Sequence, residues 1–197
     1  MTEKEKSTLG FLYNPYAKDL TEERSKCKDL CFKYNFLIPS DINNQKKIIK
    51  ELINDPNNTA IITAPFWCDY GYNITVGKNF YCNHNLIILD EAKVNIGDNV
   101  FFAPHCCVAT AGHPIDAEQR ETGLEIALPV TIGNDVWIGA NVTILPGVNI
   151  GSNVVIGAGS LVNKDIPSNV VAAGNPCKVI RNITEKDKEK YKFYEEN

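Results

Sequence analysis

Aliphatic residues recur at every sixth position through much of the chain. Aliphatic residues followed by glycine occur at Ile132, Ile138, Ile150 and Ile156, and Ile144 and Val162 fill the remaining steps. An earlier run comprises Val76, Cys82, Ile88, Ile96, Phe102 and Val108, with a two-residue insertion near Glu91. A repeat at a fixed spacing indicates stacked supersecondary units, and a period of six matches neither an α-helix nor simple strand alternation.

Three such steps make one coil of about 18 residues, with a short strand on each of three faces. We therefore expect Ile132 to stack on Ile150, Ile138 on Ile156, and Ile144 on Val162. The pattern predicts a parallel β-helix from about residue 74 to residue 171. A sandwich of short strands fits the spacing less well, because its hairpin turns would fall at irregular intervals.

The repeat is interrupted once, between Val108 and Ile132. An additional coil would place Pro114, Arg120 and Ile126 inside the solenoid, and burial of an unpaired arginine there is unfavourable. We therefore predict a loop that projects from the β-helix at about residues 110–130. Long loops on a rigid scaffold are often functional, and this one carries His113 near its base.

Before Pro56 the apolar spacing is helical. One helix is predicted with Thr21 as its cap and an end before Pro39, and a second from Ile42 to Ile53 with Ser40 or Asp41 as its cap. The first helix would bury Leu20, Cys27, Leu30, Cys31 and Tyr34. We expect a helical segment at residues 1–58, a β-helix at residues 59–182, and a short helix or tail at residues 183–197.

Composition narrows the possible partners and the location. The chain is 44% hydrophobic and 22% charged, as in ordinary globular proteins, and its formal net charge is −4. Without a long basic run, nucleic acid is not an expected partner. No apolar stretch is long enough to cross a bilayer, so no membrane is expected either. The seven cysteines lack the spacing of a secreted disulfide framework, which favours a cytoplasmic protein with reduced thiols.

Several motifs together resemble the maltose and galactoside O-acetyltransferases, a family of hexapeptide-repeat enzymes. These are the repeat itself, the Gly112-His113-Pro114 loop with Gly123-Leu124-Glu125, and the strings at residues 68–73, 79–83 and 171–176. The resemblance implies an all-β main domain that is a left-handed parallel β-helix, with a small α-helical N-terminal segment and a short C-terminal helix. It also implies acetyl-CoA as co-substrate, a sugar hydroxyl as acceptor, and a homotrimer with active sites between subunits.

The resemblance assigns catalytic roles to two residues of the loop. His113 matches the general base, which would take a proton from the sugar hydroxyl as its oxygen attacks the thioester. Glu125 matches the carboxylate that holds the other ring nitrogen in the maltose-type branch, so that branch is favoured; a backbone carbonyl is the alternative partner. The backbone N–H of Ala140 is the expected donor to the oxyanion.

The resemblance also indicates residues that bind the acceptor. Asp69, Tyr81 and Asn83 match acceptor-binding positions, and Arg24 is a further candidate. Pro15 and Glu91 depart from aspartates of the galactoside-type members, which makes a galactoside acceptor less certain. Asp69 and Asn83 are also common turn residues, so a role at the solenoid corners is the alternative.

For coenzyme A, the resemblance points to small and basic residues along the later coils. Basic side chains can bind the cofactor's phosphates. The matching positions are Trp137, Ala140, Ala158, Asn163, Lys164, Lys178 and Arg181.

Four alternatives to this site and function remain. Cys106 and Cys107 suggest an acyl-cysteine intermediate, although one of two adjacent strand residues is expected to face the core. Cys27 and Cys31 have a helical spacing compatible with a metal, but core packing is the simpler interpretation and no metal is expected to be required. A zinc enzyme of the γ-carbonic-anhydrase kind would need His84, His105 and His113 together. The fourth alternative is a solenoid scaffold without catalytic activity.

Overall fold

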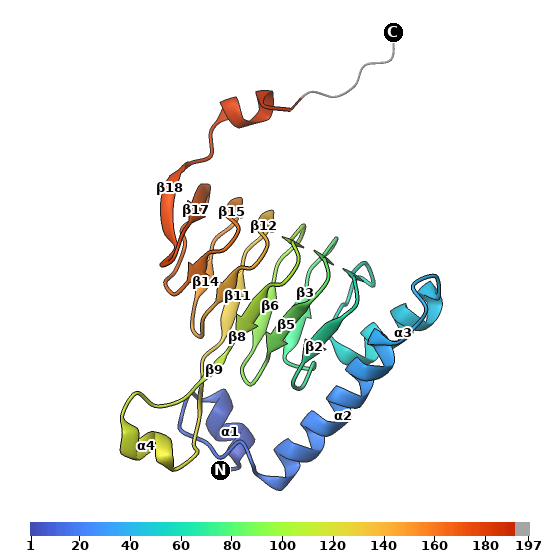
Figure 1. Cartoon of the computed structure of the whole chain (residues 1–197), viewed down its shortest axis with the longest axis vertical. Helices are drawn as coiled ribbons and strands as arrows, with labels where there is room; N and C mark the ends of the chain where they lie inside the picture. Colours follow the sequence, from blue (N-terminus) through green and yellow to red (C-terminus); the bar gives the residue numbers. More distant parts are fainter. Residues whose placement is uncertain (192–197) are drawn as a thin grey trace.

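Residues 1–191 are described in the computed structural model, and most of them wind into a left-handed parallel β-helix with three faces (Figure 1). The first face contains β3 (Ile74–Val76), β6 (Val94–Ile96), β11 (Val130–Ile132) and β14 (Asn149–Ile150). The second contains β1 (Ile61–Ile62), β4 (Tyr81–Cys82), β7 (Phe101–Phe102), β12 (Val136–Ile138), β15 (Val154–Ile156), β17 (Val170–Ala173) and β18 (Lys178–Asn182). The third contains β2 (Phe66–Cys68), β5 (Leu86–Leu89), β8 (Cys107–Ala109), β13 (Thr143–Ile144) and β16 (Leu161–Val162).

The strand register confirms the stacking that the repeat predicts. Ile132 pairs with Ile150, Ile138 with Ile156, and Ile144 with Val162. Neither the two-residue insertion near Glu91 nor the loop before Ile132 shifts the register, because Val76 pairs with Ile96 and Ile96 pairs with Ile132. These aliphatic side chains are buried in one continuous core, together with the valines two positions before them, such as Val136 and Val154.

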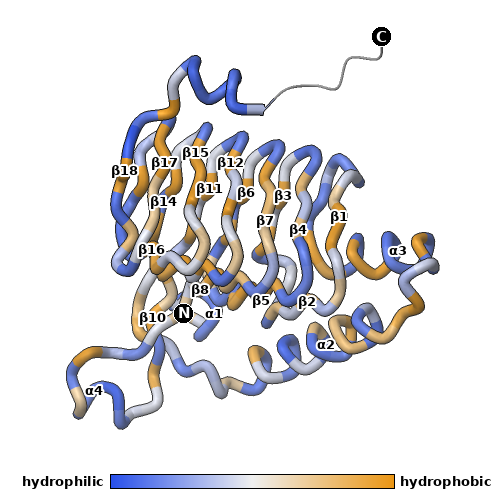
Figure 2. Tube along the Cα trace, turned by 45° about the horizontal axis from the view of Figure 1, so that its top comes forward, coloured by the Kyte–Doolittle hydropathy of each residue, from blue (hydrophilic) through white to orange (hydrophobic). Residues whose placement is uncertain are grey.

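Asparagine and aspartate side chains stabilise the corner between the first and second faces. Asn79, Asn99 and Asp135 adopt positive φ angles of 57°, 57° and 58°, a conformation that asparagine and aspartate tolerate better than most residues. The side-chain amide of Asn79 donates to Asn99 at 2.9 Å, and that of Asn99 donates to Asp135 at 2.9 Å. Figure 2 shows the turns along the upper edge of the solenoid in hydrophilic colours.

Helices cover the N-terminal end of the solenoid. α2 (Lys18–Asn35) packs against β2 and against α3 (Ile42–Leu52), and the latter is capped by Asp41 as predicted. The predicted cap Thr21 is wrong, because its N–H already donates to the carbonyl of Ala17 and Thr21 lies inside the first turn. α1 (Glu3–Thr8) was not predicted.

The last strand reverses direction. β18 runs antiparallel to β17, and η1 (Glu185–Glu189) follows as a 3₁₀-helix. The rest of the predicted C-terminal helix lies outside the described residues. Within residues 1–191, no helix has the length and apolar character needed to span a membrane.

Candidate active site

The segment after β8 leaves the coils at the corner between the third and first faces (Figure 1). It consists of β9 (Ala111–Gly112), α4 (Ala117–Glu121) and β10 (Ile126–Ala127), and β9 and β10 pair as an antiparallel hairpin. The guanidinium of Arg120 donates to the carbonyls of Pro114 and Ile115 within the loop. Arg120 therefore lies in the projecting loop and not inside the solenoid, as predicted.

Thr110 anchors the base of this loop. Its side chain is fully buried, donates to the carbonyl of Leu89 at 2.8 Å, and accepts from the N–H of Ala92 at 2.9 Å. On the returning arm of the loop, the N–H of Leu128 donates to the carbonyl of Thr110. Both arms of the loop are thus tied to the solenoid at one residue.

The hairpin brings His113 and Glu125 together, because one follows β9 and the other precedes β10. The Nδ1 atom of His113 lies 3.3 Å from the carbonyl oxygen of Leu124, and its Nε2 lies 3.8 Å from Oε1 of Glu125. The resemblance predicted that the Glu125 carboxylate would hold the ring nitrogen that does not act as the base. In the structure, the Leu124 carbonyl lies beside Nδ1, and Glu125 lies beside Nε2. Half of the His113 side chain is exposed, so a substrate can reach it.

Tyr13, from the N-terminal segment, holds the Glu125 side chain. Its hydroxyl donates to Oε2 of Glu125 at 2.7 Å, and the two backbones exchange hydrogen bonds of 3.0 Å in both directions. Tyr13 is 1% exposed, and burial followed by the Glu125 contact raises its pKa far above the ordinary value. The phenol therefore stays protonated and remains a donor. The sequence pattern did not single out Tyr13.

Three carboxylates gather at the same corner, on the two coils before the loop. Asp90 is fully buried, and its Oδ1 accepts from the N–H groups of Asp69 and Tyr70 at 3.0 and 2.9 Å. Burial raises the pKa of Asp90 to about 7. Burial and then the neighbouring Asp69 raise the pKa of Glu91. Asp90 thus fixes the backbone of the segment that carries Asp69.

Two basic residues of α2 contact this corner. The Nζ atom of Lys28 lies 3.6 Å from Oδ1 of Asp69. Arg24 donates to the hydroxyl of Tyr70 at 2.6 Å and to the carbonyl of Pro15. Both predicted acceptor residues of this group, Arg24 and Asp69, therefore lie at the same corner as the loop base, although the Arg24 guanidinium already has two partners.

The remaining predicted acceptor residues lie elsewhere on the same chain. Tyr81 is in β4 on the second face, and Asn83 follows it at the corner between the second and third faces. Trp137 is in β12, more than half exposed, and Ala140 and Ala158 lie at the same corner as Asn83. In the described part of the chain, no hydrogen bond or ion pair joins these residues to His113 or Glu125.

The backbone at Ala140 has the property expected of an oxyanion donor. The N–H groups of its neighbours, Gly139 and Asn141, donate to the carbonyls of Ile156 and Pro104. Within residues 1–191, no backbone carbonyl accepts from the N–H of Ala140. This donor is available to a ligand at the corner.

The other residues predicted to bind the cofactor lie directly after β16 and in β18. Asn163 and Lys164 follow β16, and Lys178 begins β18. Arg181, also in β18, forms hydrogen bonds of 2.6 and 2.8 Å with Asp187. Phosphate binding by Arg181 would therefore have to replace the Asp187 carboxylate.

Two of the alternative chemistries, the three-histidine zinc site and the acyl-cysteine intermediate, find no support in the described residues. The three histidines do not form a ligand group in the described residues, where the cluster of Cys27, Cys31 and Cys68 is the one set of three metal-ligating side chains within reach of a single ion. Burial raises the pKa of both Cys106 and Cys107, which opposes a nucleophilic thiolate.

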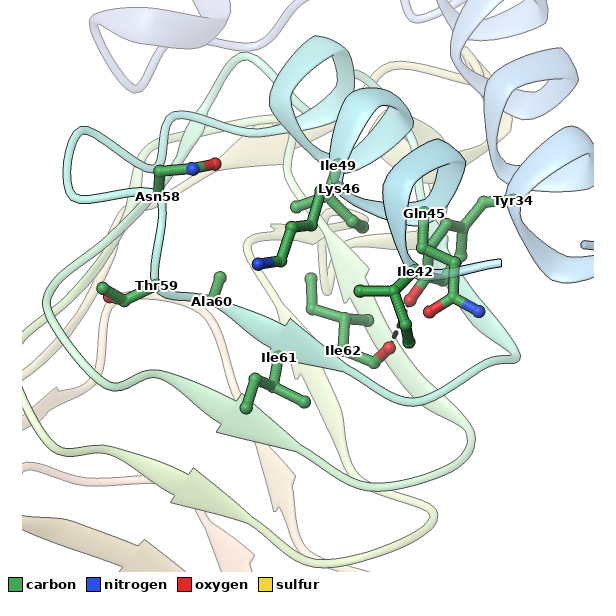
Figure 3. A pocket seen from close by; sticks show the side chains of 10 residues that line it. All are labelled: Tyr34, Ile42, Gln45, Lys46, Ile49, Asn58, Thr59, Ala60, Ile61 and Ile62. Carbon is green, nitrogen blue, oxygen red and sulfur yellow. Dashed lines mark hydrogen bonds between the residues drawn. The ribbon is translucent and has the colours of Figure 1, made fainter. Parts of the chain in front are cut away.

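A hollow of about 490 Å³ lies between α3 and β1, away from the loop (Figure 3). Figure 3 shows the side chains of Ile42, Ile49, Ile61 and Ile62 around it, with Lys46 as its charged residue. The Tyr34 hydroxyl donates to the carbonyl of Ile62 at its rim. Its lining includes no carboxylate and no histidine, so it offers no general base.

Comparison with known proteins identifies the family. A family model described as a maltose acetyltransferase hexapeptide capping motif matches residues 6–56, and one described as a bacterial transferase hexapeptide of six repeats matches residues 129–164. Galactoside O-acetyltransferase of Escherichia coli K12 is 46% identical over 187 residues, which cover 95% of this chain and 92% of that protein. The chain belongs to the hexapeptide-repeat sugar O-acetyltransferases.

Two solved structures of this acetyltransferase family are also similar. The maltose O-acetyltransferase of Clostridium difficile 630 is 47% identical with a TM-score of 0.91, over 94% of this chain and 99% of that one. A galactoside acetyltransferase in complex with coenzyme A is 44% identical with a TM-score of 0.92, over 100% of this chain and 99% of that one. The predicted family and fold are confirmed, and the chain is an acetyltransferase.

Proposed function

We propose that this acetyltransferase transfers the acetyl group of acetyl-CoA directly to a sugar hydroxyl, with His113 as the general base. The observation that carries the proposal is the placement of the imidazole. Because Nδ1 faces the Leu124 carbonyl, the ring proton belongs on Nδ1, and Nε2 keeps a lone pair that can accept a proton. The solved relative with coenzyme A supports acetyl-CoA as the donor.

Each step has a residue to perform it. The sugar hydroxyl gives its proton to Nε2 of His113 as its oxygen attacks the thioester carbon, and Oε1 of Glu125 stabilises the imidazolium. The N–H of Ala140 donates to the oxyanion of the tetrahedral intermediate. When the carbon–sulfur bond breaks, the coenzyme A thiolate leaves and takes the proton from His113.

The proposed site needs two copies of the chain. His113 projects from the corner between the third and first faces, whereas Ala140, Ala158 and Asn83 lie at another corner. A neighbouring copy in a homotrimer would bring the second set of residues to the first. Trp137, Lys164 and Lys178 would then contact coenzyme A.

We favour a maltose-like acceptor over a galactoside. The carboxylate of Glu125, which is typical of the maltose-type branch, is held by the Tyr13 hydroxyl. Pro15 replaces an aspartate of the galactoside-type members, and its carbonyl already accepts a hydrogen bond from Arg24. Asp69 remains available to a sugar hydroxyl beside Lys28. We also propose a cytoplasmic location, which the seven free thiols support.

The test follows release of the coenzyme A thiol from acetyl-CoA with maltose, glucose and a galactoside as acceptors. For His113→Ala we expect a loss of roughly 10²- to 10⁴-fold in kcat, the usual contribution of a general base. Gln119→Ala, in the same loop, is the matched control and should retain full activity. Unchanged turnover in His113→Ala would refute the mechanism, and the absence of transfer to every sugar by the wild type would refute the proposed function.

A further inference from the structure

Three cysteine side chains meet where α2 packs against the first coils. The Sγ of Cys68 lies 3.5 Å from that of Cys27 and 3.7 Å from that of Cys31. The three sulfurs all lie within 4.8 Å of one another, and the three residues are 0–4% exposed. Cys27 and Cys31 come from one face of α2, and Cys68 ends β2.

This arrangement differs from that of the other buried cysteines. Cys106 donates to the backbone carbonyls of Ala103 and Gly139, as a single thiol that fills core space does. Cys27, Cys31 and Cys68 instead direct their sulfurs toward one point. The carbonyl oxygen of Cys68 lies on the same cluster, 3.6 Å from Sγ of Cys27 and 4.0 Å from Sγ of Cys31.

The spacing suits a tetrahedral ion. Zinc–sulfur bonds of about 2.3 Å place neighbouring sulfurs about 3.8 Å apart, and a zinc–oxygen bond of about 2.1 Å gives a sulfur–oxygen edge of about 3.6 Å. Two of the three sulfur–sulfur distances, 3.5 and 3.7 Å, and the sulfur–oxygen distances of 3.6 and 4.0 Å are close to these edges. The third sulfur pair, Cys27 and Cys31, lies within 4.8 Å. An ion could therefore enter with small shifts of the side chains.

We propose that Cys27, Cys31 and Cys68 form a structural site for a soft d¹⁰ cation, zinc or copper(I), with the Cys68 carbonyl as a fourth donor to zinc. Soft thiolates select these ions. The ion would clamp the N-terminal helical segment to the first coils. Cys68 precedes Asp69, so the clamp would also stiffen the acceptor side of the corner. Within residues 1–191, no hydrogen bond or ion pair joins these thiols to His113, so the role proposed for the ion is structural.

The experiment adds zinc, or copper(I) under anaerobic conditions, to the reduced full-length protein, followed by gel filtration and metal analysis. We expect one equivalent of one of the ions per chain and a higher Tm that magnesium does not produce. Cadmium is a spectroscopic probe, because a thiolate-to-metal charge-transfer band should appear with the same stoichiometry. The two arms decide between zinc and copper(I).

Cys68→Ser and Cys31→Ser should each abolish stoichiometric binding, whereas Cys177→Ser, which removes a thiol outside the cluster, should retain it. Circular dichroism and acetyl transfer by the serine variants verify their fold. No uptake by the reduced wild type, or uptake that Cys68→Ser leaves intact, would overturn the proposal. A Cys27–Cys68 disulfide in protein isolated under thiol-blocking conditions would overturn it as well. The zinc titration of the wild type stands even if a serine variant does not fold.

Discussion

Glu125 has its two oxygens committed to different partners. Oε2 accepts from the buried phenol of Tyr13, and Oε1 faces Nε2 of His113. A carboxylate held in this way can stabilise the imidazolium only if its orientation is maintained. We therefore propose Tyr13 as a positioning residue, which connects the N-terminal segment with the loop that carries His113.

Tyr13→Phe tests this connection. Loss of a hydrogen bond to a charged group is expected to lower kcat about tenfold, which corresponds to roughly 1.4 kcal/mol, with little change in the KM for acetyl-CoA. Steady-state kinetics measure both parameters. Tyr16→Phe, an exposed tyrosine of the same segment, is the control. A lower Tm with an unchanged kcat would show that Tyr13 serves only stability.

Asp90 makes stability depend on pH. Burial raises its pKa from 3.8 to about 7, so between these values the folded protein binds a proton that the unfolded chain has lost. This contribution to stability is present below the unfolded pKa and disappears as the pH rises through the folded pKa. We expect urea unfolding midpoints to fall from about pH 4 to about pH 7, with this part of the decline absent in Asp90→Asn.

Asp29→Asn, which changes an exposed aspartate on α2, is the control for Asp90→Asn and should keep the pH dependence of the wild type. Equal slopes in Asp90→Asn and the wild type would show that Asp90 stays ionised in the folded protein at these pH values.

The sequence draws attention to residues that interrupt its pattern. His113 is a candidate because the repeat breaks beside it, and its catalytic role stays a prediction. Tyr13 was missed because its partner Glu125 is 112 positions away, and no local periodicity records such a contact. Cys68 was likewise invisible beside Cys27 and Cys31, since only the packing of α2 on β2 brings it to them.

At the scale of elements, the corner ladder allows a direct test of why asparagine recurs. Asn99→Val places a β-branched residue at a positive φ angle of 57°, which should destabilise the fold by about 1–2 kcal/mol or more. Asn99→Gly loses the same two side-chain hydrogen bonds but tolerates the backbone conformation. Urea unfolding of both variants isolates the backbone contribution, and equal losses would show that the hydrogen bonds alone matter.

The six-residue period predicted every strand pair that it addressed, because inward aliphatic residues must stack in register to fill a narrow core. It could not predict β18, whose five residues are all exposed and carry no inward position. Nor could it fix the start of α2, because the N-cap is Ala17, whose side chain forms no capping hydrogen bond that a sequence pattern could reveal.

At the scale of the whole molecule, the proposed site depends on two corners of different chains. Mixed oligomers of His113→Ala and Asn83→Ala should recover activity, because some interfaces would combine an intact loop with an intact opposite corner. Coexpression with two affinity tags and thiol-release assays measure this recovery.

The homotrimer itself is tested by light scattering, which should give three times the 21.9 kDa of one chain. A fully active monomer would contradict the arrangement between subunits.

The reversed strand at the end of the solenoid has a consequence for polymer growth. A parallel coil ends in a row of unpaired backbone groups, which is a template for another chain to extend into a fibre. β18 occupies the β17 edge in the opposite direction and presents Lys178 and Arg181 outward. On this face, a second copy would therefore meet a charged antiparallel strand instead of a continuation of the coil, which opposes end-to-end polymerisation.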